Sequence, residues 1–140
     1  MKEAGKLPAI RQTLTLHAPI VKVWEAVSTS EGIAAWFMPN DFQPVKGHEF
    51  RLHTPYGVSS CKVTELDPPN RLTFTWGANW VVTFELHERG NHTEFTLIHD
   101  GWEAGKQMAE TGEKQEVVRD RMDSGWGSAV LPRLKSFVEA

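Results

Sequence analysis

The sequence has little cysteine, little tyrosine and no long apolar run. Its 140 residues include one cysteine, Cys61, which excludes an internal disulfide and is typical of a protein from a reducing compartment. No stretch of about 18 apolar residues is present, so we expect no membrane-spanning segment. Residues 1–8 lack the apolar region of a secretory signal peptide. Together these absences predict a cytoplasmic protein.

An excess of charge of one sign is also lacking. The 15 lysines and arginines are interspersed with 18 aspartates and glutamates, which gives a formal net charge of −3. The chain therefore shows no basic face of the kind that binds nucleic acid. The glycine-rich turns that hold nucleotide phosphates are missing as well. We expect neither a nucleic acid nor a nucleotide as a partner.

What the chain does contain is many aromatic side chains without hydroxyl groups. Six Trp and seven Phe accompany a single Tyr, and the length suits one domain with a substantial core. Side chains of this kind either fill a core or line an apolar binding site. The composition alone favours neither of these two interpretations.

Hydrophobic periodicity predicts six strands and three helices. The strands are expected over residues 10–16, 48–54, 58–66, 71–76, 80–87 and 92–99. Two short helices are expected over 20–27 and 31–36, with Ser30 as the N-cap of the second, and a long helix over 116–139. Residues 101–112 are expected to form a loop or an irregular helix. Because glycine is costly inside a helix, Gly125 and Gly127 indicate a bend or a close approach to the sheet.

This order of elements predicts an α+β fold in which the last helix packs on the sheet. A long amphipathic helix that follows antiparallel strands buries its apolar stripe against them. The stripe consists of Val118, Met122, Trp126, Val130, Leu134 and Val138. The strand side chains opposite are also large. A strongly bent antiparallel sheet of about six strands around this helix can therefore leave a lined cavity.

Four groups of residues carry a resemblance to a known family. They are Ala18-Pro19 before residues 23–26 (VWEA), residues 36–39 (WFMP), residues 67–72 (DPPNRL) leading into 74–76 (FTW), and Gly125-Trp126 ahead of Leu131 and Leu134-Lys135. Their order and spacing over about residues 10–139 resemble the helix-grip fold of the SRPBCC/START-like superfamily. Within it, the chain is most similar to the homologues of the heat-shock-protein-90 ATPase activator's C-terminal domain, of the stand-alone bacterial type.

The resemblance implies one START-like ligand-binding domain over residues 1–140, with residues 1–9 as a flexible N-terminus. The wider superfamily includes lipid and polyketide binders, and also some cyclases and hydrolases. The leading hypothesis is therefore the binding of a small apolar or aromatic molecule, lipid-, polyketide- or flavonoid-like, in a cavity between sheet and last helix. The alternatives are a chaperone ATPase-activator-like module that contacts a chaperone, and a cyclase- or hydrolase-type enzyme that uses the same pocket.

The inward-facing side chains are the candidates for the pocket walls. They are Gln12, Trp36, Phe50, Leu52, Cys61, Val63, Phe74, Trp76, Val82, Phe84, Phe95, Leu97, His99, Trp126, Val130 and Leu134. The apolar members would supply most of the affinity, and Gln12 or His99 would orient the ligand by a hydrogen bond. A partly buried His99 can also exchange a proton with a ligand, but the favoured interpretation is a hydrogen bond to the last helix.

No residue pattern indicates a catalytic or metal centre. Cys61 is expected to behave as a small buried apolar residue, because no base is evident beside it. The six histidines are scattered; His87 and His92 flank one hairpin loop, but a third ligand is not evident. We therefore expect no catalytic residue, no metal and no cofactor.

Overall fold

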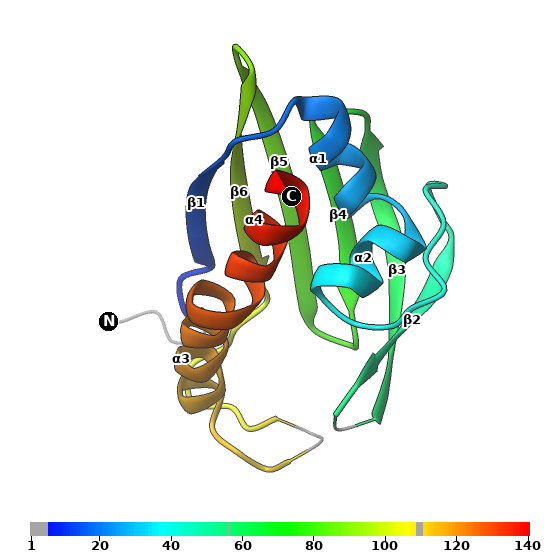
Figure 1. Cartoon of the computed structure of the whole chain (residues 1–140). Helices are drawn as coiled ribbons and strands as arrows, with labels where there is room; N and C mark the ends of the chain where they lie inside the picture. Colours follow the sequence, from blue (N-terminus) through cyan, green and yellow to red (C-terminus); the bar gives the residue numbers. More distant parts are fainter. Residues whose placement is uncertain (1–5, 56, 109–110) are drawn as a thin grey trace.

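The computed structural model describes residues 6–55, 57–108 and 111–140. Within them the chain forms an antiparallel sheet in the order β1-β6-β5-β4-β3-β2, and the helices lie on one face of it (Figure 1). The strands are β1 (Ile10–Leu16), β2 (Glu49–Thr54), β3 (Gly57–Asp67), β4 (Arg71–Trp76), β5 (Trp80–Arg89) and β6 (His92–Asp100). The helices are α1 (Ile20–Val27), α2 (Ser30–Trp36), α3 (Gln115–Gly125) and α4 (Leu131–Glu139).

The expected α+β helix-grip architecture is confirmed. Each expected strand and helix is present, with ends that differ by at most two residues. The hairpin between β5 and β6 is tighter than expected from residues 88–91, because Glu88 and Arg89 still pair with Thr93 and His92. Gly90 makes this short turn possible with a φ of 66°.

The two faces of the sheet differ as the alternation predicts. Leu72, Phe74 and Trp76 of β4 are buried on the helix side. On the other face Thr73 is also buried. Its hydroxyl finds partners there, the Thr83 hydroxyl at 3.0 Å and the Glu65 carboxylate at 2.9 Å. An outward-facing position is therefore not always an exposed one.

The N-cap of α2 is Thr29, so the expectation for Ser30 was wrong. The Thr29 hydroxyl accepts a hydrogen bond from the Gly32 backbone N–H at 3.0 Å. Ser30 lies inside the first turn, and its hydroxyl instead donates to the Asn40 carbonyl at 2.9 Å. The helix begins one residue earlier than the apolar pattern suggests, which moves the capping position back by one.

The C-terminal helix contains a π-helical turn, Trp126–Val130, between α3 and α4. The Leu131 backbone N–H donates to the Trp126 carbonyl, five residues earlier. The wide turn ends two residues before Pro132, which has no N–H to donate and disturbs regular helical bonding. The expected close approach to the sheet is confirmed at Gly127, where a Cβ would lie 2.9 Å from the Gln12 side-chain oxygen. At Gly125, by contrast, nothing lies within 4 Å of the position that a Cβ would take.

Residues 1–5 of the N-terminus expected to be flexible lie outside the described residues. Of residues 6–9, Lys6 forms a bridge with Glu103, and the Leu7 backbone N–H donates to the Trp102 carbonyl at 3.1 Å. Within the described part of the chain, no helix has the length and apolar character needed to cross a membrane.

Candidate functional site

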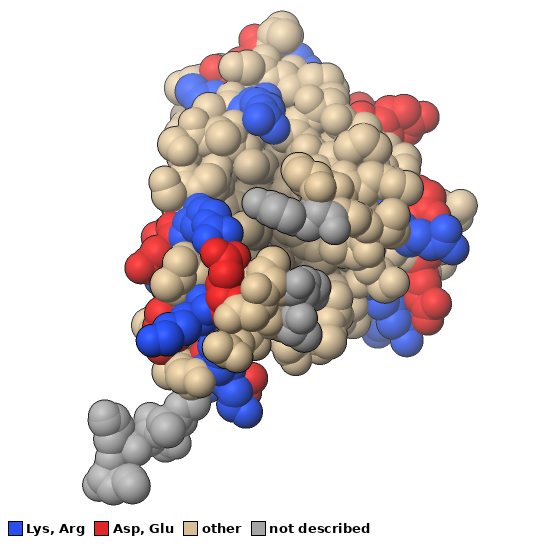
Figure 2. Space-filling model, turned by 90° about the horizontal axis from the view of Figure 1, so that it is seen from below, with Lys and Arg blue, Asp and Glu red and all other residues tan. Residues whose placement is uncertain are grey.

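A cavity of about 490 Å³ lies between the C-terminal helix and the sheet, at the end where α3 begins. The helix contributes Val118, Arg121, Met122, Gly125, Trp126, Val130 and Arg133. The loops and strands contribute Phe37, Met38, Thr54, Pro55, Ser59, Trp76, Trp80, Met108, Thr111 and Glu113. Figure 2 shows this end of the molecule: the described residues near its middle are mostly uncharged, and most Lys, Arg, Asp and Glu side chains lie toward its edges.

The cavity wall is built on a chain of aromatic rings. Phe37 stacks on Trp126 with ring centroids 5.1 Å apart, and meets Trp76 edge-on at 5.6 Å. Trp80 then meets Trp76 edge-on at 5.1 Å. These geometries are favourable for aromatic pairs, so the wall is preorganised from the α2 end to the start of β5.

His99 lies behind this wall and holds Trp126 in place. Its Nδ1 accepts a hydrogen bond from the Trp126 indole N–H at 3.1 Å, which confirms the favoured interpretation that His99 bonds the last helix. Trp76 and Trp80 pack against the same imidazole, whose Nε2 has no hydrogen-bond partner among the described residues. Burial, and to a lesser extent the charge of Arg119, lower the pKa of His99 to about 3. The ring is therefore neutral, with its proton on Nε2.

Gln12 also finds its partners within the protein. Its side-chain amide donates to the Asp123 carbonyl at 2.8 Å and to the Asp123 carboxylate at 2.7 Å. Gln12 does not line the cavity. It ties β1 to α3 beside Gly127, and so fixes the distance between helix and sheet at that point.

The predicted pocket residues fall into three groups. Trp76, Trp126 and Val130 line the cavity. Phe50 and Cys61 line a second hollow at the β2 edge of the sheet. Apart from Gln12 and His99, the others pack inside the core, away from the cavity: Trp36, Leu52, Val63, Phe74, Val82, Phe84, Phe95, Leu97 and Leu134. Alternation identifies the inward face of a strand, but it does not show where helix and sheet separate.

Several cavity residues were missing from the sequence-based candidates. Val118 and Met122 belong to the recognised helix stripe, but the loop residues Phe37, Met38 and Met108 do not. One signal was available, because three of the four methionines of the chain line the cavity. Methionine is flexible and polarisable, and is common at surfaces that adapt to varied apolar ligands.

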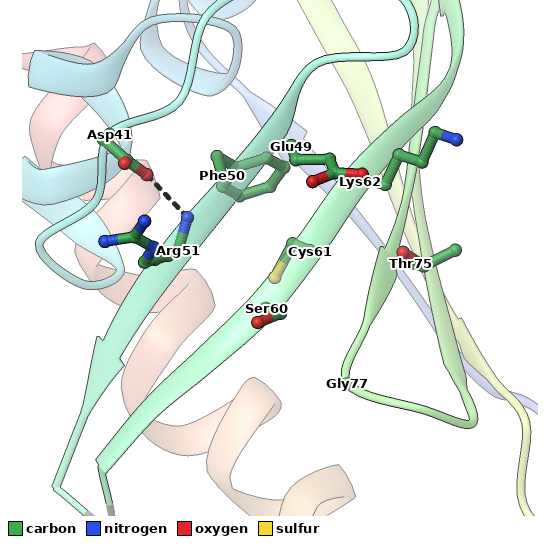
Figure 3. Close-up of a pocket in the computed structure, with 9 residues that line it drawn as sticks. All are labelled: Asp41, Glu49, Phe50, Arg51, Ser60, Cys61, Lys62, Thr75 and Gly77. Carbon is green, nitrogen blue, oxygen red and sulfur yellow. Dashed lines mark hydrogen bonds between the residues drawn. The ribbon is translucent and has the colours of Figure 1, made fainter.

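The second hollow, of about 460 Å³, is polar (Figure 3). The Arg51 backbone N–H donates to the Asp41 carboxylate at 2.6 Å, and that bond lowers the pKa of Asp41. Burial raises the pKa of Cys61 to about 12, so this thiol stays protonated and is a poor nucleophile.

The histidines do not assemble into a metal centre in the described part of the chain, where no cluster of three or more His, Cys, Asp or Glu could hold an ion. His87 pairs with Glu94 across the β5–β6 ladder. The ring of His92 instead lies beside His17, with centroids 5.8 Å apart. The two histidines of the hairpin are therefore not partners of each other.

The comparisons with known proteins agree with this fold. Residues 17–139 match the family model described as "Activator of Hsp90 ATPase homolog 1-like protein". The solution structure of protein BH1534 from Bacillus halodurans is 45% identical, with a TM-score of 0.89 over 96% of this chain and 99% of that one. No curated protein matches the sequence.

Two more distant structures share the fold. The Aha1 dimer from Colwellia psychrerythraea is 19% identical, with a TM-score of 0.77 over 95% of this chain and 97% of that one. PFC0360w, an HSP90 activator from Plasmodium falciparum, is 17% identical, with a TM-score of 0.76 over 95% and 97% of the two chains. At these identities the likeness concerns the fold alone.

Proposed function

The chain belongs to the family of Activator of Hsp90 ATPase homolog 1-like proteins, and from that premise we propose that it binds a small apolar or aromatic molecule between its sheet and its C-terminal helix. The observation that carries this proposal is the cavity of about 490 Å³, whose walls are mostly apolar and include aromatic rings and thioethers. Small-molecule sites typically have this size, with apolar walls and few polar groups. A lipid-, polyketide- or flavonoid-like compound fits that description.

Burial of apolar surface supplies the affinity. A ligand that buries roughly 300 Å² of apolar area gains about 7 kcal/mol at about 25 cal/mol per Å². The loss of translational and rotational freedom offsets part of this gain. We therefore expect dissociation constants in the micromolar range or weaker.

Binding without catalysis suits the titratable groups near the cavity. Glu113 is engaged by Arg121, which lowers the pKa of its carboxyl and keeps it ionised. His99 is neutral and lies behind the aromatic wall, and the Cys61 thiol is protonated in the other hollow. None of these groups is poised as a nucleophile or base that faces a ligand.

Gly125 offers a direct test of the proposal. It lines the cavity, and nothing lies within 4 Å of the position its Cβ would take. The variant Gly125→Phe should fill the cavity, while Gly125→Ala adds only a methyl group and is the matched control. The uncharged dye N-phenyl-1-naphthylamine should gain fluorescence with the wild type and with Gly125→Ala, and lose that gain with Gly125→Phe. It should also raise the melting temperature of the two binding forms.

Equal dye binding by all three forms would place the dye outside the cavity and reject the proposal. Absence of dye binding by the wild type, together with stimulated ATP turnover by an added chaperone, would favour the protein-interaction alternative.

A further inference from the structure

Among the residues that the structure describes, the charged side chains that line the cavity do not balance to zero net charge. They are Glu113, Arg121 and Arg133. The Arg121 guanidinium donates from both of its terminal nitrogens to the two oxygens of Glu113, one of these bonds being 3.1 Å long. This pair is neutral as a unit, so Arg133 gives the described part of the cavity lining a net positive charge.

Arg133 makes no hydrogen bond or ion pair with any residue that the structure describes. It is exposed and lies three residues after Val130, on the same side of the helix. The stripe that lines the cavity therefore runs from Met122 through Trp126 and Val130 and ends at the guanidinium of Arg133. Leu134, the next residue of the expected apolar stripe, is fully buried in the core instead.

The cavity thus combines an apolar interior with a cation at its rim, Arg133, that is unpaired within the described part of the chain. A guanidinium presents a planar set of N–H donors that matches the two oxygens of a carboxylate or the oxygens of a sulfonate. Hydrogen bonds between such charged groups are stronger than neutral ones. A ligand with an apolar body and an acidic head would satisfy both parts of the site at once.

We propose that the natural ligand class of this cavity is an amphipathic organic anion, with its apolar body between Trp76, Trp126 and Met122 and its acidic head on Arg133. This inference rests on the proposed function, since it concerns the same cavity. Arg133 also gives the ligand one orientation, which the apolar walls by themselves cannot do because hydrophobic contact has no direction.

A pair of dyes tests the inference. 8-Anilino-1-naphthalenesulfonate and N-phenyl-1-naphthylamine share one apolar body and differ in the sulfonate. Fluorescence titration of the wild type should give a dissociation constant about tenfold lower for the sulfonate dye, and this advantage should shrink in 0.5 M NaCl because the rim is solvent-exposed.

Variants then locate the charge that is responsible. Arg133→Gln should remove most of the advantage of the sulfonate dye and change the affinity for the uncharged dye much less. Arg133→Glu should weaken the sulfonate dye further, because it reverses the charge. Arg11→Gln is the matched control, since Arg11 is an exposed arginine of β1 on the opposite face of the sheet. It should leave both dissociation constants unchanged.

The outcomes separate this inference from the proposed function. Uncharged-dye binding that Gly125→Phe abolishes, without any preference for the sulfonate, would retain the function and overturn the inference. A sulfonate preference that survives Arg133→Gln and Arg133→Glu would also overturn it. If neither dye binds to the wild type, the proposed function fails and the inference fails with it.

Discussion

The two ends of the interface between sheet and C-terminal helix are built from similar residues but packed differently. At the closed end α4 contacts α1, α2 and β1, and Trp36, Phe84 and Leu134 are at most 1% exposed. At the open end α3 is tied to β1 by the hydrogen bonds from Gln12 to Asp123, and half-buried residues such as Met122 and Val130 line the cavity. Figure 1 shows α1 and α2 beside α4, whereas α3 lies at the other end of the helix, away from α1 and α2.

The difference shows that the covering elements, and not the apolar character of the residues, decide whether a core closes. Trp36 is sealed because its ring packs on Phe84 at 5.6 Å and its indole N–H donates to the Ala26 carbonyl at 2.8 Å. Trp126 is just as buried in the protein, but one side of it borders empty space. The π-helical turn that begins at Trp126 lies at the boundary between the two ends. Turns of this kind are rare and often lie at functional sites.

The largest effect on this comparison should come from truncating a tryptophan at the closed end. Trp36→Ala should lower the free energy of unfolding by about 3–5 kcal/mol, because the removed ring leaves a cavity in a packed core. Trp80→Ala, at the half-buried wall of the open end, should cost clearly less. Urea unfolding of both variants measures the two losses. Equal losses would mean that the two ends do not differ in packing.

The second effect concerns His99, which is fully buried behind the aromatic wall of the cavity. Above pH 6.5 this histidine is neutral in both the folded and the unfolded state and adds no pH dependence. As the pH falls below 6.5, His99 becomes protonated in the unfolded chain, whereas in the folded state it stays neutral down to about pH 3. The free energy of unfolding should therefore fall by about 1 kcal/mol per pH unit.

Urea unfolding at pH 7, 6 and 5 measures this slope, and His99→Gln should remove it. The range avoids the carboxyls of Glu65, Glu113 and Glu139, whose pKa values lie below the usual 4.5 because of hydrogen-bond donors beside them. An identical slope in wild type and variant would show that water from the cavity reaches the imidazole.

The smallest effect comes from two glycines of the helix, one on each side of the boundary. Gly127→Ala should lower the free energy of unfolding by about 1 kcal/mol, because the new Cβ would lie 2.9 Å from the Gln12 side-chain oxygen, and moving that side chain strains its hydrogen bonds to Asp123. Gly125→Ala should raise it by about 0.5–1 kcal/mol, because the position is open and alanine favours the helix. Thermal melts give the sign of each change. If both variants change the melting temperature in the same direction, the helix is not closer to the sheet at Gly127 than at Gly125.

Local chemistry was sufficient to predict the strands and helices of this protein and their inward faces, and the resemblance to a family added the helix-grip arrangement. The alternation in residues 71–76 placed Leu72, Phe74 and Trp76 on one face of a strand, and all three are buried there. Helical spacing identified the stripe from Val118 to Val138. These predictions depend on residues a few positions apart, whose relation is fixed by the periods of strand and helix.

The site depended on distances that no local pattern contains. The partner of Gln12 is Asp123, 111 residues away, and the partner of Trp126 is His99. The missing Phe37, Met38 and Met108 come from loops, whose path is set by what they pack on. A sequence-based list of inward-facing residues therefore contains the core and the cavity wall together.

The sequence by itself determined the order of strands and helices and which side chains point inward, because these follow from backbone periodicity and from the cost of exposing apolar surface. Only the tertiary structure decided where the interior stays open. That depends on the angle at which the helix leaves the sheet, on the π-helical turn before Pro132, and on Gln12 and Gly127, which set the helix–sheet spacing. A cavity is a difference between two large volumes, the space enclosed by the backbone and the side chains that fill it, and residues far apart in the chain contribute to both.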